Sequence, residues 1–115
     1  MTQLTLNLIQ GSITFNFTPE AAKNLKQEIL QLIQNIKTVA TSKTSGRDRP
    51  SPRQSMEYRY SGEVFLEVFC NPNIYPSPYA AKVLITLKDD LIRITSEAEL
   101  TRSIEDLDRY LEQTS

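Results

Sequence analysis

Apolar and polar side chains alternate in several short segments of this chain, and this alternation limits the folds that it can adopt. Leucine occupies every second position of residues 4–8, and Ile13, Phe15 and Phe17 repeat the pattern after Gly11. A period of two gives a strand one apolar face and one polar face. Glycine also suits the tight turn of a hairpin. Residues 4–17 therefore predict a β-hairpin.

The periodicity then changes to that of a helix. Thr18 is a suitable N-cap and Pro19 suits the first helical position. Six apolar residues follow at spacings of three and four, which places them on one face of a helix: Ala22, Leu25, Ile29, Leu32, Ile36 and Val39. We interpret this stripe as a helix lying on a sheet. The alternative is a coiled-coil seam with another chain, although the stripe is shorter than such seams usually are.

Residues 41–55 differ from the rest of the chain. They include no apolar residue, and they carry four basic side chains against one acidic side chain. A segment of this composition does not bury enough surface to offset the entropy of ordering. We expect a flexible internal loop within a single domain that spans residues 1–115.

The second half of the chain predicts two more hairpins and a second helix. Alternating or continuous apolar runs, bounded by turn residues, indicate four further strands: residues 56–60, 64–70, 82–87 and 91–95. Ser96 and Glu99 have the spacing of a capping box. An apolar helical stripe follows: Leu100, Ile104, Leu107 and Leu111. The expected fold class is α+β, with an antiparallel sheet of about six short strands (three hairpins) and two helices packed on one face.

The composition excludes several classes of functional site. The chain has no histidine, a single cysteine and a net charge of −1. Histidine-based triads, histidine metal sites, internal disulfides and cysteine-rich zinc sites are therefore excluded. The near-neutral charge argues against a general binder of nucleic acids or membrane surfaces. No two glycines share a loop, so no phosphate-binding loop is present. We expect no metal and no cofactor.

No group of reactive side chains predicts catalysis. The aspartates at residues 89–90 lie at a predicted turn. Glu105, Asp106 and Asp108 are expected on the exposed side of the last helix, where acidic residues are usually solvated. Cys70 ends an apolar strand without a basic neighbour in sequence, which favours a small buried apolar residue over a nucleophile. We expect that the chain is not an enzyme.

The basic segment offers one candidate for binding. Its cations precede two tyrosines, Tyr58 and Tyr60, as in some proteins that bind single-stranded nucleic acids. Both tyrosines share their alternation face with Met56, however, and so look like core residues. An acidic protein partner is the favoured interpretation for this segment. The cations concerned are Lys43, Arg47, Arg49 and Arg53.

Strand alternation predicts a second candidate, an apolar contact patch. Phe65, Phe69 and Leu84 fall on the face opposite the helices, which is otherwise polar. A partner protein or the chain's own loops would have to cover them. The simplest partner is a second copy of the chain, in a homodimer. Tyr75 and Tyr79, in the proline-rich connection after the second of these strands, are further candidates for contacts with a partner.

A resemblance to a known family rests on residues 71–87 and on the acidic helix that follows. These residues read Asn-Pro-Asn-Ile-Tyr-Pro-Ser-Pro-Tyr-Ala-Ala-Lys-Val-Leu-Ile-Thr-Leu. The segment resembles small accessory proteins of cyanobacteria, and the size and order of the elements are similar to those of the carboxysome-shell assembly factors (the CcmS family). The resemblance implies an adaptor that holds a disordered tail of a shell protein, and it transfers no binding residues.

These features together predict a protein-interaction domain. The chain begins without a basic leader, and its apolar runs are too short for a membrane helix, so we expect a cytoplasmic location. The leading hypothesis is a non-enzymatic assembly adaptor that binds another protein, in particular an extended segment of it, at a sheet edge or an aromatic pocket. The alternative is a single-stranded nucleic-acid binder that uses residues 43–53.

Overall fold

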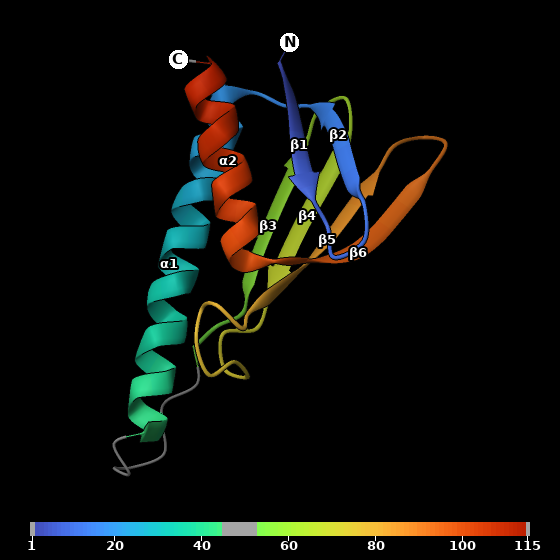
Figure 1. The fold of residues 1–115 in the computed structure, drawn as a ribbon. Helices are drawn as coiled ribbons and strands as arrows, with labels where there is room; N and C mark the ends of the chain where they lie inside the picture. The colour runs from blue at the N-terminus through green and yellow to red at the C-terminus, as the bar shows by residue number, and fades with distance from the viewer. Residues whose placement is uncertain (1, 45–52, 115) are drawn as a thin grey trace.

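The computed structural model describes residues 2–44 and 53–114. Within these ranges the chain forms six antiparallel strands, arranged as three hairpins, and two helices, which confirms the predicted α+β fold (Figure 1). The elements are β1 (Gln3–Asn7), β2 (Ser12–Asn16), α1 (Pro19–Thr44), β3 (Met56–Ser61), β4 (Phe65–Cys70), β5 (Lys82–Lys88), β6 (Arg93–Glu99) and α2 (Leu100–Thr114).

The strands belong to two sheets. β1 pairs with β2, and the other four strands form a meander in the order β3-β4-β5-β6. A backbone hydrogen bond of 2.9 Å, from the N–H of Ile9 to the carbonyl of Glu97, links the turn of the first hairpin to the edge strand β6. Alternation predicts each hairpin but not this division, because pairing between hairpins depends on contacts that are distant in sequence.

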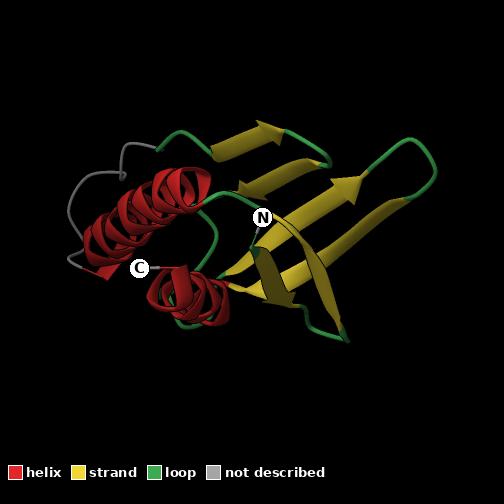
Figure 2. Cartoon of the chain, turned by 90° about the horizontal axis from the view of Figure 1, so that it is seen from above, coloured by secondary structure: helices red, strands yellow, loops and turns green. Residues whose placement is uncertain are grey.

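Both helices lie on the same side of the strands, as Figures 1 and 2 show. α1 packs against β3 and against α2, and α2 packs against β1 and β6. An ion pair joins the two helices, because the Nζ atom of Lys26 lies 2.6 Å from Oδ1 of Asp108. One face of the four-stranded sheet is thus turned toward the helices, and the other is turned away from them.

The core lies between the helices and the inner faces of the strands. Its largest fully buried side chains come from both sheets and both helices: Leu4, Leu6, Phe17, Leu25, Ile29, Leu32, Ile36, Leu66, Val83, Ile85, Leu100 and Leu107. The whole apolar stripe of α1 is buried within this one chain. This confirms the interpretation of α1 as a helix that lies on a sheet.

α1 begins where the sequence predicts and ends later. The hydroxyl of Thr18 accepts a hydrogen bond of 3.1 Å from the N–H of Ala21, as an N-cap does. The helix continues to Thr44, so the prediction that residues 41–44 belong to the flexible loop was wrong. Extending an existing helix is easier than starting one, because each added residue contributes a hydrogen bond. Residues 45–52 lie outside the described residues.

The predicted capping box was also wrong. Ser96 and Glu99 belong to β6, where Ser96 pairs with Ile85 of β5. α2 begins only at Leu100, whose N–H donates to the carbonyl of Ala81 at 3.0 Å. Pairing with β5 holds these residues in an extended conformation, and this tertiary interaction overrides the local helix signal.

Asp106 is a third correction. The sequence places it on the exposed side of α2, but its exposed fraction is 3%. Its carboxylate accepts hydrogen bonds from the backbone N–H of Asn7 (2.8 Å) and from the Asn7 side-chain amide (2.9 Å). The Nε atom of Arg102 lies 3.4 Å from the same carboxylate. α2 therefore has a second buried side, which faces β1, while Glu105 stays exposed as predicted.

Candidate functional site

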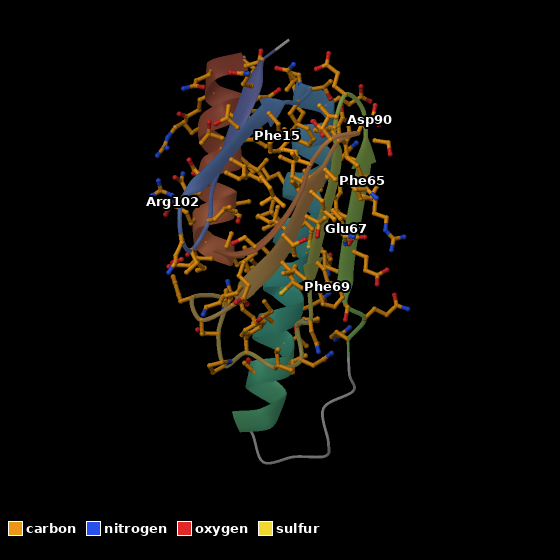
Figure 3. The ribbon with its side chains drawn as sticks, turned by 90° about the vertical axis from the view of Figure 1, so that its right-hand side faces the viewer. Phe15, Phe65, Glu67, Phe69, Asp90 and Arg102 are labelled. Carbon is orange, nitrogen blue, oxygen red and sulfur yellow. The ribbon has the colours of Figure 1, made fainter. Side chains whose placement is uncertain are left out.

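The face of the β3–β6 sheet that is turned away from the helices, hereafter the outer face, carries the predicted contact patch (Figure 3). Strand pairing arranges its side chains in three rows. The rows are Glu57–Phe69–Leu84–Glu97, Arg59–Glu67–Thr86–Thr95 and Ser61–Phe65–Lys88–Arg93. Two glutamates therefore flank an apolar centre formed by Phe69 and Leu84.

The structure brings two of the three predicted patch residues together. Phe69 and Leu84 pair directly across β4 and β5, and their exposed fractions are 36% and 41%, respectively. Phe65 lies apart, four residues from Phe69 along β4, with the ammonium of Lys88 4.8 Å from its ring centroid. Glu67 lies between the two phenylalanines. The apolar patch is therefore smaller than alternation alone predicts.

A pocket of about 190 Å³ opens at the Phe69 end of the outer face. Phe69 and Leu84 form part of its lining, and Ile74 and Tyr75 reach it from the proline-rich connection. The hydroxyl of Tyr75 donates to the backbone carbonyl of Lys82 at 3.2 Å, and burial raises the pKa of Tyr75. We call this feature the outer-face pocket. Sequence reasoning selected Tyr75 but missed its neighbour Ile74, although 63% of Ile74 is exposed.

The other predicted binding residues do not join this pocket. Tyr79 is 85% exposed and does not line it. Arg53 is exposed too, and its backbone forms two hydrogen bonds with the side chain of Asn73, at 2.9 and 2.8 Å. Arg47 and Arg49 lie outside the described residues. The structure therefore joins Tyr75 to Phe69 and Leu84 and places Tyr79 and Arg53 elsewhere.

The two tyrosines of the nucleic-acid hypothesis, Tyr58 and Tyr60, pack against the hydrophobic core. The ring of Tyr60 packs edge-on against Phe17, with 4.8 Å between the centroids. The hydroxyl of Tyr58 donates to the carbonyl of Ala21 at 3.3 Å, and burial raises the pKa of Tyr58 to about 12. Both side chains are partly buried and pack against the core, as their alternation with Met56 predicts.

Two of the reactive side chains selected from the sequence, Cys70 and Asp89, have contacts that stabilise the fold. Cys70 is buried, and burial raises the pKa of its thiol to about 11, so the thiol stays protonated at neutral pH. Asp89 accepts hydrogen bonds from the N–H groups of Ile92 and Leu91, which lower its pKa and close the β5–β6 turn. In residues 2–44 and 53–114, no cluster of acidic or cysteine side chains is arranged to hold a metal ion. Across the same ranges, no helix is long and apolar enough to cross a membrane.

The chain matches no family model, no curated protein and no solved structure. The resemblance to the carboxysome-shell assembly factors therefore stays a prediction. The candidate site rests on the geometry of the outer face.

Proposed function

We propose that the chain is a non-enzymatic protein-interaction domain that binds another protein through the outer face, around Phe69 and Leu84. In the cytoplasm, the proposed location, reducing conditions suit an unpaired thiol such as that of Cys70. The resemblance noted in the sequence would make the partner a disordered tail of a carboxysome shell protein, held by an assembly adaptor.

The observation that carries the proposal is the unequal covering of the sheet. The inner faces of β4 and β5 are buried by the chain's own helices and first hairpin, whereas Phe69 and Leu84 stay exposed beside a pocket. Glu57 and Glu97 flank this apolar pair. An apolar centre with a polar rim is the usual anatomy of a protein interface, and a few central side chains supply most of its binding energy.

The test compares two leucines that undergo the same change. Leu84→Glu places a charge in the outer-face pocket, and Leu91→Glu places it at the β5–β6 turn, where Leu91 is 91% exposed. Each variant and the wild type is immobilised and exposed to the same native extract, and the retained proteins are quantified by mass spectrometry. Thermal melts check that both variants fold.

We expect a partner that the wild type and Leu91→Glu retain equally and that Leu84→Glu retains about thirty-fold less, the effect of removing one central contact. Sedimentation velocity tests whether the partner is a second copy, because Leu84→Glu would then abolish a homodimer. Equal retention by all three proteins, together with an unchanged oligomeric state, would show that the outer face is not the interface.

A further inference from the structure

The hydrogen bonds of the first hairpin determine which way each backbone group of β1 points. The N–H of Phe17 donates to the carbonyl of Thr2 at 3.0 Å, and the N–H of Leu8 donates to the carbonyl of Gly11 at 2.9 Å. Hydrogen-bonded and non-hydrogen-bonded pairs alternate along an antiparallel ladder. The backbone N–H and C=O groups of the even-numbered residues of β1 therefore point toward β2, and those of the odd-numbered residues point away from it.

The outward edge of β1 is mostly unpaired. Asn7 donates its backbone N–H to Asp106 of α2 at 2.8 Å, which shows that this edge faces α2. Among the described residues, the outward N–H and C=O groups of Gln3 and Thr5 form no hydrogen bond. An unpaired edge is a template on which an extended polypeptide can add as another strand.

A groove of about 350 Å³ runs between this edge and α2. Gln3, Thr5 and Asn7 line one side of it. The other side is one face of the helix, because its residues are spaced four, three and four apart: Arg102, Asp106, Arg109 and Gln113, together with Tyr110. Figure 3 shows Arg102 beside the first hairpin. We call this feature the β1–α2 groove.

The charges of α2 are divided unevenly around the helix. The helix carries four carboxylates and two arginines, yet both arginines line the groove and only one carboxylate does. That carboxylate, Asp106, is buried against Asn7 and Arg102. Within the described part of the chain, Arg109 has no ion-pair partner. Because Arg102 pairs with Asp106 and also lies 4.0 Å from Glu105, the groove lining carries one net positive charge, that of Arg109, although the helix as a whole is acidic.

We propose that the β1–α2 groove binds an extended, acidic segment of a partner protein, which adds to β1 as a further strand. Its backbone pairs with Gln3 and Thr5, and its carboxylates face Arg109, because Arg102 already pairs with Asp106 and Glu105. Asp106 already occupies the N–H of Asn7, so the added strand ends there. This short pairing makes charge the main source of selectivity, and the affinity falls as salt is added. The groove is separate from the outer face and does not depend on it.

The test uses two labelled peptides of nine residues, one alternating glutamate with valine and the other alternating lysine with valine. Binding is measured by fluorescence anisotropy at low and at physiological salt. Arg109→Glu reverses the charge of the groove, and Arg93→Glu makes the same change on the outer face as a matched control. Thr5→Pro removes an outward N–H that the fold itself does not use, a substitution that edge strands tolerate.

We expect the acidic peptide to bind the wild type and Arg93→Glu equally, and the basic peptide not to bind. Arg109→Glu should weaken binding by about tenfold or more, because it replaces an attraction between opposite charges with a repulsion between like charges. Thr5→Pro should abolish binding, and the amides of Gln3 and Thr5 should gain protection from hydrogen exchange when the peptide is bound. If Thr5→Pro unfolds in a melt, this exchange measurement alone decides whether a strand is added.

The proposal would be overturned by no binding of the acidic peptide to the wild type, by equal binding to Arg109→Glu, or by unchanged exchange at Gln3 and Thr5. A dimer that pairs β1 with β1 and excludes the peptide would also overturn it. Leu84→Glu should bind the peptide like the wild type. A loss of binding in that variant would move the peptide to the outer face and overturn the groove proposal, whereas failure of the outer-face test would leave the groove result intact.

Discussion

Asp106 is the residue at which the two ends of the chain meet. Two donors of Asn7 and the guanidinium of Arg102 converge on its buried carboxylate. The sequence does not indicate this role, because Asp106 lies next to the exposed Glu105 in a helix rich in acidic residues. Its partner in β1 is 99 residues away in the chain. Nothing local to α2 distinguishes a buried carboxylate from a solvated one.

Replacing Asp106 with alanine should therefore be costly. Asp106→Ala leaves the N–H of Asn7 without its acceptor and removes the carboxylate beside Arg102, so the free energy of unfolding should fall by about 3 kcal/mol. Glu105→Ala, the exposed neighbour, should change it by less than about 0.5 kcal/mol. Urea unfolding followed by circular dichroism measures both values. Equal costs for the two variants would mean that the Asp106 contacts contribute no stability.

At the scale of the element, two similar sequence signals lead to different structures. Thr18 precedes α1 and caps it through its hydroxyl. Ser96 has the better motif, with Glu99 three residues later, yet both residues lie in β6. The difference lies in the neighbours, because β5 supplies a pairing edge along the whole of β6. Among residues 2–44 and 53–114, no strand pairs with residue 18, so its local signal decides the structure there.

The two signals can be separated by matched substitutions. Thr18→Ala should lower the free energy of unfolding by about 1 kcal/mol, the usual cost of losing an N-cap. Ser96→Ala should lower it by less than about 0.5 kcal/mol, because its side chain caps no helix. Chemical denaturation of both variants gives the comparison. A cost at Ser96 as large as that at Thr18 would indicate a working cap at the start of α2.

For the whole molecule, the sequence predicts what depends on local periodicity. The hairpins, the stripe of α1 and the exposure of Phe69 and Leu84 follow from alternation within single segments. The outer-face pocket was predicted only in part, since Ile74 enters it from an irregular connection that has no periodicity. The β1–α2 groove was not predicted, because it joins strands and a helix from opposite ends of the chain. The features that were predicted lie within single segments, and those that were missed join residues that are distant along the chain.

Two buried groups predict how the stability of the whole fold depends on pH. Burial raises the pKa of Cys70 from 9.0 to about 11 and that of Tyr58 from 10.0 to about 12. The unfolded chain loses these protons at lower pH than the folded chain does. Stability from this source is therefore fully present below pH 9 and is lost as the pH rises through 11 and 12.

The urea midpoint should accordingly be lower at about pH 10.5 than at pH 8, because only the unfolded state ionises readily in that range. Cys70→Ala should lower stability by about 1 kcal/mol at neutral pH and reduce this alkaline loss. Tyr79→Phe, which changes an exposed ring, should keep the wild-type pH dependence. A midpoint that stays constant up to about pH 10.5 in the wild type would contradict the prediction.

The contacts between β1 and α2 also have a consequence for the order in which the molecule is completed during synthesis. The ribosome makes the first hairpin at the start of synthesis. Two of its hydrogen bonds form only with residues of α2, because the carbonyl of Phe17 accepts from the hydroxyl of Tyr110 and the N–H of Asn7 donates to Asp106. The inner side of that hairpin stays without its cover until nearly the whole chain has been made. A nascent chain halted before α2 therefore exposes Leu4, Leu6 and Phe15 to whatever else is in solution, and the last helix closes the fold.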